Sequence, residues 1–143
     1  MNIYEEFIKE SNHIEGEDNL PIDVESLKKF LANDLTEENL HEYHLIVSGK
    51  QSRSGKRRDC NVWIGGHVTP PPSTIPWYMK KYFKQLPKLS AFEAHNKFEA
   101  IHPYMDFNGR MGRAIRLHKM QNVYDWKISF LHNYYYQTLS HLS

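Results

Sequence analysis

A chain of 143 residues is long enough to form one domain with a hydrophobic core, and its 40% hydrophobic and 24% charged residues exclude a disordered chain. A net charge of +1 gives no overall field that would favour nucleic acid or an anionic membrane. The single cysteine, Cys60, excludes an intrachain disulfide, and no apolar stretch has the length of a membrane span or a leader. We therefore expect one cytoplasmic domain.

Most of the chain has the periodicity of amphipathic helices, with apolar residues three and four positions apart. Residue types that begin or end helices mark the boundaries, such as the capping pair Ser90 and Glu93 and the terminator Gly16. Helices are predicted over residues 1–16, 23–33, 36–49, 76–86 and 90–102, from residue 108 onward, and around 131–139.

The period changes to two between Cys60 and Thr69, where apolar and polar residues alternate on both sides of Gly65 and Gly66. Alternation around two glycines predicts a β-hairpin. Three prolines at 70–72 end it, because proline has no N–H to donate to a β-ladder. The predicted fold class is therefore mostly α, a helical bundle with one inserted β-hairpin.

The segment IHPYMDFNGRMGR, residues 101–113, contains the residues most suggestive of chemistry. One helix ends at His102, a loop carries Asp106, and a new helix begins with Arg110 and Arg113 in its first turns. A helix start favours an anion, and arginines three apart share a helix face and can bind successive phosphates. Asp106 suits a hard cation and His102 titrates near neutrality, so the pattern predicts phosphoryl or nucleotidyl transfer.

Each of these residues taken alone also has an ordinary structural interpretation. A histidine before proline is often only a helix end, two arginines three apart are often a solvated face, and an aspartate before Asn-Gly is often a cap. The order in which they follow one another favours the catalytic interpretation.

The stretch from His102 to Arg113 resembles the signature of the Fic family, H-P-F-x-[D/E]-G-N-G-R-x-x-R. Residues 57–69 resemble the flap hairpin of that family. The sequence SNHIEG at 11–16 resembles the inhibitory motif [S/T]-x-x-x-E-[G/N] that some members carry before the catalytic core. The resemblance implies a single Fic domain over 1–143, with an inhibitory helix at 1–16, a flap at 57–69 and an active site at 102–113.

A member of this family is expected to be a protein adenylyltransferase, which transfers AMP from ATP to a Tyr, Thr or Ser hydroxyl of a target protein and uses Mg²⁺. The resemblance assigns His102 as the general base and Asp106 as the metal ligand. The nucleotide-binding residues that it implies are Asn108, Gly109, Arg110 and Arg113. The flap residues that would pair with an extended target segment are Val62, Trp63, Ile64, Gly65 and Gly66.

The implied inhibitory motif consists of Ser11, Glu15 and Gly16. Glu15 is expected to pair with Arg113 and so to misplace the triphosphate in the resting protein. In some relatives the same glutamate supports removal of the attached nucleotide, so the resemblance extends to de-AMPylation.

Two residues depart from the family signature. Tyr104 stands where phenylalanine is usual, and its hydroxyl needs a partner or water. Phe107 stands where the family has a small glycine, which permits unusual dihedral angles and a close approach of phosphate. We expect the Phe107 ring to point outward, which would preserve the backbone cradle.

Three functions therefore remain open: an adenylyltransferase, a related transferase such as a Doc-like kinase or a phosphocholine transferase, and a catalytically impaired Fic fold that acts as a binding module. His41 and His44 lie three apart, so they do not form the zinc pattern H-E-x-x-H. The basic segment 50–58 has no aromatic platform for nucleic acid. The sequence does not determine the target or the oligomeric state, a homo-oligomer included.

Overall fold

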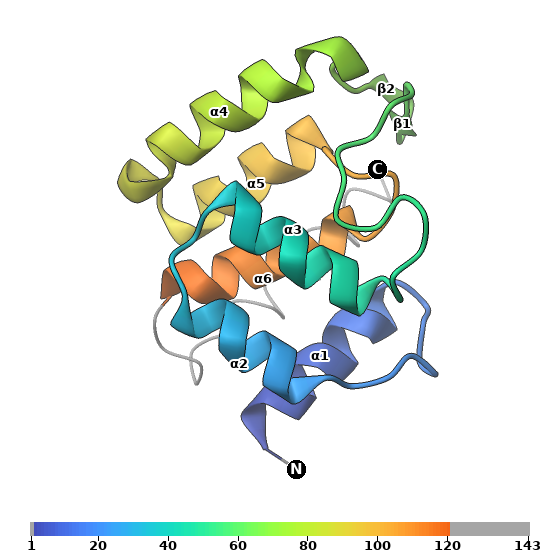
Figure 1. Ribbon diagram of the computed structural model, residues 1–143, viewed down its shortest axis with the longest axis vertical. Helices are drawn as coiled ribbons and strands as arrows, with labels where there is room; N and C mark the ends of the chain where they lie inside the picture. Colours follow the sequence, from blue (N-terminus) through green and yellow to red (C-terminus); the bar gives the residue numbers. More distant parts are fainter. Residues whose placement is uncertain (1, 121–143) are drawn as a thin grey trace.

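The computed structural model describes residues 2–120, in which six helices and one short hairpin form (Figure 1). The elements are α1 (Ile3–Ile14), α2 (Val24–Ala32), α3 (Glu37–Val47), β1 (Trp63–Ile64), β2 (His67–Val68), α4 (Ile75–Gln85), α5 (Ala91–Ile101) and α6 (Asn108–Met120), with 3-10 turns at Pro72–Thr74 and Leu86–Lys88. The predicted fold class, mostly α with one inserted β-hairpin, is confirmed. The helix predicted around 131–139 lies outside the described residues.

Side-chain caps explain where four of the helices begin. Asn2, Asp23, Thr36 and Ser90 each accept a hydrogen bond from a backbone N–H in the first turn of the following helix. Ser90 and Glu93 also form the reciprocal capping box that their spacing predicts. Because these signals are local, the predicted starts agree closely with the structure.

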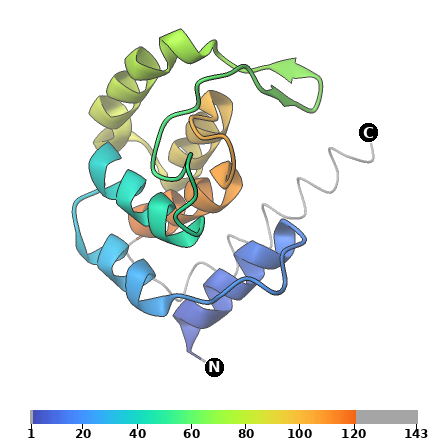
Figure 2. The same cartoon turned by 45° about the vertical axis from the view of Figure 1, so that its right-hand side comes forward.

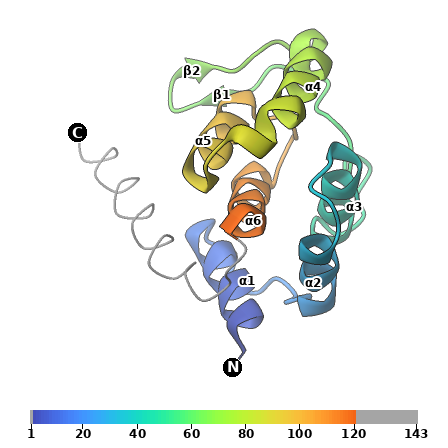
Figure 3. The same cartoon turned by 90° about the vertical axis from the view of Figure 1, so that its left-hand side faces the viewer.

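Helix α6 occupies the middle of the molecule, with α5 on one side of it and α1 on another, while α2 and α3 cover a third side (Figures 1 and 3). The core contributed by these helices and by α4 includes the fully buried side chains Leu27, Leu40, Ile75, Met79, Phe98 and Ile115. No helix within residues 2–120 combines the length and the apolarity that crossing a membrane requires. The central position of α6 brings its arginines into reach of α1.

The hairpin is shorter than the alternating sequence predicts. Within the flap region at 57–69, Trp63 pairs with Val68 and Ile64 with His67, and the strands extend no further. Trp63 is 69% and Val68 63% exposed, and the hairpin projects from the helical body in Figure 2. A two-stranded ribbon with no buried face has little to stabilise a longer ladder.

Candidate active site

The active-site loop, residues 102–107, connects α5 to α6 and has a left-handed residue at each end. His102 follows α5 with φ +52°, and Phe107 precedes α6 with φ +68°. This conformation costs a residue other than glycine about 1–2 kcal/mol, so the contacts around the loop must hold it. Phe107 thus keeps a backbone conformation for which glycine is better suited.

Asn108 closes the loop through both ends of its side-chain amide. Its Oδ1 accepts from the Tyr104 N–H at 2.9 Å, and its Nδ2 donates to the Tyr104 carbonyl at 2.7 Å. Both residues are buried. The Asn108 side chain, which the family resemblance assigns to nucleotide binding, therefore shapes the loop. The backbone N–H of Asn108 is the group that remains for an anion.

His102 presents a half-buried imidazole whose Nδ1 is enclosed and has no hydrogen-bond partner among residues 2–120. Burial lowers the pKa of His102 below its ordinary value of 6.5, and the nearby carboxylate of Glu99 offsets part of that effect. The imidazole is therefore neutral at neutral pH and can accept a proton.

Helix α1 binds the guanidinium of Arg113. Its Nε donates to Ser11 Oγ at 2.8 Å, and its Nη2 donates to the Ser11 carbonyl at 3.1 Å and to Glu15 Oε1 at 2.6 Å. Arg113 is only 5% exposed, which shields these charge-assisted bonds from water. The pairing of Glu15 with Arg113 that the motif predicts is thus present.

The Glu15 carboxylate lies against the first turn of α6. A Cβ on Gly109 would come within 2.5 Å of Glu15 Oε1, so the present position of the carboxylate depends on the absence of a side chain there. The first N–H groups of a helix lack partners within the helix and attract anions. An oxyanion therefore already sits beside Gly109 and Arg113, where the sequence predicts phosphates.

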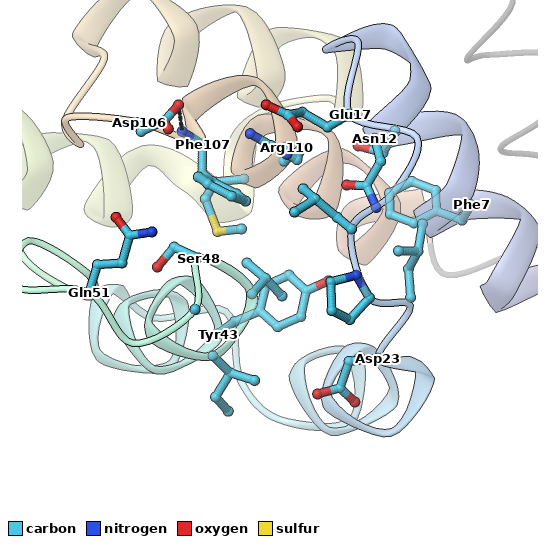
Figure 4. Close-up of a pocket in the computed structure, with 18 residues that line it drawn as sticks. Phe7, Asn12, Glu17, Asp23, Tyr43, Ser48, Gln51, Asp106, Phe107 and Arg110 are labelled. Atoms are coloured by element: carbon cyan, nitrogen blue, oxygen red, sulfur yellow. Dashed lines mark hydrogen bonds between the residues drawn. The ribbon is translucent and has the colours of Figure 1, made fainter.

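Arg110 faces a mostly apolar cavity of about 380 Å³ that lies between α1, α3 and the active-site loop (Figure 4). Its guanidinium lies over the Phe107 ring, 3.4 Å from the ring centroid. Its Nε and Nη1 are buried and have no hydrogen-bond partner within the described part of the chain. The expectation that Phe107 points outward is wrong, because its ring lines the cavity and packs against Arg110 instead.

Asp106 is the exposed carboxylate of the loop, and its Oδ1 accepts from the neighbouring Phe107 N–H at 2.8 Å. Residues 2–120 contain no group of three or more His, Cys, Asp or Glu side chains placed to hold a metal. Mg²⁺ commonly binds through one or two carboxylates together with substrate phosphates and waters. Arg110, two of whose donors lack a partner within the described residues, lines the same cavity, so Asp106 fits a Mg²⁺ that phosphates also bind.

The hydroxyl of Tyr104 forms a hydrogen bond with His41 of α3. It lies 2.7 Å from His41 Nδ1, His41 Nε2 lies 3.1 Å from Glu37 Oε1, and Glu37 also pairs with Arg57. Burial raises the pKa of Tyr104 well above its ordinary value, which keeps the hydroxyl protonated. The departure from phenylalanine therefore adds a hydrogen-bonded chain from the loop to the surface.

Arg58 belongs to the basic segment 50–58, in which charged side chains would be expected to face solvent, yet it is only 3% exposed. Its guanidinium donates to the carbonyls of Ile101 and His102 at the end of α5, and to those of Cys60 and Pro70 at the base of the hairpin. Composition alone could not have found this role, because the run of basic residues around Arg58 resembles a solvated loop.

The flap residues are held mainly by local bonds. Thr69 donates through its N–H and Oγ1 to the Val62 carbonyl, at 3.4 and 2.8 Å. Gly65 and Gly66 have φ of +52° and +85°, as the tight turn of a two-residue hairpin loop requires. Trp63 and Ile64, which precede this turn, leave their side chains exposed.

The fold is helical, and its site combines a histidine and a carboxylate on one loop with two arginines in the first turns of the following helix, a set of residues suited to a transferase. The model of the Fic/DOC family matches residues 34–118, more than half of the chain, so this chain belongs to the Fic/DOC family. The family and its relatives indicate a transferase.

The curated relatives are similar over part of their length. The protein adenylyltransferase Fic of Drosophila yakuba is 32% identical over 93 residues, and that of Drosophila melanogaster is 31% identical over 93 residues. Each match covers 57% of this chain and 19% of the relative. The matched region is thus about a fifth of the length of these relatives.

Two solved structures share the fold. A Fic family protein from Desulfovibrio desulfuricans aligns with a TM-score of 0.60 at 23% identity, over 80% of this chain and 42% of its own. A Fic domain containing signaling protein from Bacteroides thetaiotaomicron aligns with a TM-score of 0.56 at 20% identity, over 91% of this chain and 71% of its own.

Proposed function

We propose that this chain is a protein adenylyltransferase that transfers AMP from ATP to a Tyr, Thr or Ser hydroxyl of a target protein. One observation carries the proposal: near a helix start, the Nδ1 of His102 and two donors of Arg110 are buried without partners among residues 2–120, in a chain whose relatives are named adenylyltransferases. A proton and a phosphate chain are the ligands that such groups need.

The proposed reaction begins with the neutral imidazole of His102. His102 takes the proton of the target hydroxyl, and the hydroxyl oxygen forms a bond to the α-phosphorus of ATP. The bond between that phosphorus and the oxygen bridging to the β-phosphate breaks, and pyrophosphate leaves. The lowered pKa of His102 favours this role, because the base must be unprotonated at neutral pH.

In the same proposal the phosphates bind at the start of α6. The backbone N–H groups of Asn108 and Gly109 and the guanidinium groups of Arg110 and Arg113 supply the positive potential. Asp106 would hold Mg²⁺, which supplies charge neutralisation to the leaving pyrophosphate.

Glu15 makes the described state an inhibited one in this proposal. Its carboxylate accepts a hydrogen bond from the guanidinium of Arg113, and Ser11 accepts two further hydrogen bonds from the same guanidinium. The β- and γ-phosphates would have to displace this carboxylate in order to bind Arg113. De-AMPylation assisted by Glu15 belongs to the same proposal.

The flap would dock the target. Within residues 62–66, the exposed strand Trp63–Ile64 would receive an extended target segment by backbone hydrogen bonds, with Val62, Gly65 and Gly66 flanking it, and this would align the target hydroxyl with His102. The side chains exposed on the hairpin would then contact the target.

The test is mass spectrometry of the protein and of candidate targets after incubation with ATP and Mg²⁺. We expect a gain of AMP that increases in Glu15→Ala and disappears when His102→Ala is added to that variant. A gain of phosphate would replace the proposal with a Doc-like kinase. Absence of both modification and nucleotide binding would favour the binding module. The packing of Phe107 against Arg110 is the observation that favours this alternative, because it engages a guanidinium that would otherwise bind phosphate.

A further inference from the structure

We infer that His44 is a positioning residue of the active site, which sets where the Asp106 carboxylate meets Mg²⁺ through a hydrogen bond to the Asp106 backbone. The inference rests on the proposed function, because it concerns how that site would hold its metal. His44 lies on α3, 62 positions before Asp106 in the sequence, and with His41 it does not form the zinc pattern H-E-x-x-H.

Both nitrogens of the His44 ring are used. Its Nε2 lies 2.9 Å from the carbonyl oxygen of Asp106, and its Nδ1 lies 2.8 Å from the backbone nitrogen of Gly55. A carbonyl can only accept and a backbone N–H can only donate, so Nε2 carries the proton and Nδ1 accepts. The ring is therefore a neutral imidazole in one tautomer that links two backbone groups.

The ring is also fixed by packing against the loop. His44 is 3% exposed and stacks on Tyr104 with 3.9 Å between ring centroids and 15° between planes. The Phe107 ring meets it edge-on at 6.1 Å. Asp106, Tyr104 and Phe107 all belong to the active-site loop, so one side chain of α3 contacts three of its residues.

Gly55, whose N–H donates to His44 Nδ1, is itself packed closely against α3. Gly55 has φ +69°, and a Cβ there would lie 2.9 Å from the His41 carbonyl oxygen and 3.1 Å from the Leu45 Cβ. The segment around Gly55 thus lies close against α3, and a larger residue at position 55 would prevent this approach. This close packing keeps the Gly55 N–H directed at His44 Nδ1.

Asp106 depends on this support because its own side chain has little. Its carboxylate is exposed, and its hydrogen bond within residues 2–120 goes to the next residue, Phe107. The place of the carboxylate is therefore set mainly by the Asp106 backbone, whose carbonyl His44 holds. Groups that orient a metal ligand in this way typically change metal affinity by about 10–100-fold when they are removed.

Two similar variants separate the two bonds of the ring. His44→Gln places an amide donor near the position of Nε2 and can keep the bond to Asp106. His44→Asn places an amide acceptor near the position of Nδ1, so it can keep the bond to Gly55 but cannot reach Asp106. Both variants lose the aromatic stack on Tyr104, so a difference between them reports the bond to Asp106.

The first measurement is the Mg²⁺ affinity of each variant with a non-hydrolysable ATP analogue, by calorimetry in the Glu15→Ala background. We expect His44→Asn to weaken Mg²⁺ binding by about 10–100-fold and His44→Gln by less than about 3-fold. Affinity for the analogue without Mg²⁺ should be the same in both. Tyr104→Phe, which removes only the hydroxyl bonded to His41, should leave Mg²⁺ affinity unchanged.

The second measurement needs neither a variant nor activity. Nitrogen NMR of the unaltered chain should show His44 as the neutral tautomer protonated at Nε2. A proton on Nδ1 would overturn the inference, as would equal Mg²⁺ affinity in His44→Asn and His44→Gln. If the Glu15→Ala protein binds no Mg²⁺ with the analogue, the proposed function fails, and the NMR result still decides whether His44 holds the Asp106 carbonyl.

Discussion

The active-site loop and the flap hairpin meet at Arg58 but are held in opposite ways. The loop at 102–107 is bonded to α3 through His41 and His44, and Asn108 closes it from within. The hairpin consists of two paired residues on each strand and buries neither face.

The difference reflects what each region is proposed to do. Groups that act on a developing charge are effective when they are in place before the substrate arrives, because no reorganisation is then needed during the reaction. A strand that docks a partner gains its missing hydrogen bonds from that partner. We therefore expect mutations in the loop to act on catalysis, and mutations in the flap to act on target binding.

The largest effect is expected from His102→Ala, which removes the proposed general base from the active-site loop. Transfer of AMP should fall by about 10²–10⁴-fold, the usual contribution of a positioned base. Rates measured by mass spectrometry in the Glu15→Ala background would show this, with nucleotide affinity as the control. A variant that kept its rate would remove His102 from the mechanism.

Glu15→Ala should have the next largest effect, in the opposite direction. A hydrogen bond to a charged group contributes about 1.5–3 kcal/mol, so release of Arg113 should raise affinity for Mg²⁺ and ATP by about 10–150-fold. Calorimetry tests this, and Glu10→Ala, at an exposed position of α1, the helix that Glu15 follows, is the matched control. Equal affinity in both variants would contradict the inhibitory role.

Arg58→Lys should destabilise the junction of the two regions. Lysine keeps the charge but cannot reproduce the planar set of donors that reaches four carbonyls, so the free energy of unfolding should fall by about 2–3 kcal/mol. Urea denaturation measures this. Arg53→Lys, on an exposed position, should change it by less than about 0.5 kcal/mol, and an equal effect would show that Arg58 is not an anchor.

The pH dependence of transfer reports the protonation state of His102 in the active-site loop. Because burial lowers the pKa of His102 below 6.5, the base stays unprotonated at neutral pH and becomes protonated only as the pH falls through that lowered pKa. The profile of kcat/KM should therefore decline on the acid side with a midpoint below pH 6.5, the ordinary value for histidine. A decline centred above pH 6.5 would indicate another base or a different environment.

The smallest effect on stability is expected from Trp63→Ala in the flap. Its side chain is 69% exposed, so the free energy of unfolding should change by less than about 0.5 kcal/mol. The KM for a protein target should rise while kcat is maintained, because the proposed loss is in docking. A loss of stability above about 1 kcal/mol would show that Trp63 is packed against the body.

The helices and the central motif could be predicted because their signals are local. Caps such as Asp23 and Ser90 lie within a few residues of the N–H groups that they bind, and periodicity shows which face of a helix is buried. The pairing of Glu15 with Arg113 spans 98 positions, and a family motif rather than a physical signal predicted it.

Only the tertiary structure decided how the loop is supported and where Phe107 points. His41, His44 and Arg58 lie 44 to 63 positions from the residues that they bind there. No periodicity or capping rule connects such distant residues. The Phe107 ring turns toward the cavity because Arg110 packs on one side of it and His44 on another.

The amino-acid sequence by itself determined the helices, the site of the turn in the hairpin and the chemistry available at residues 102–113, since each depends on neighbours along the chain. The packing of α3, α1 and α6 determined which of those groups are bound and which are left without partners. The physical reason is that burial and hydrogen bonding depend on distance in space, and folding brings together segments that the sequence keeps apart.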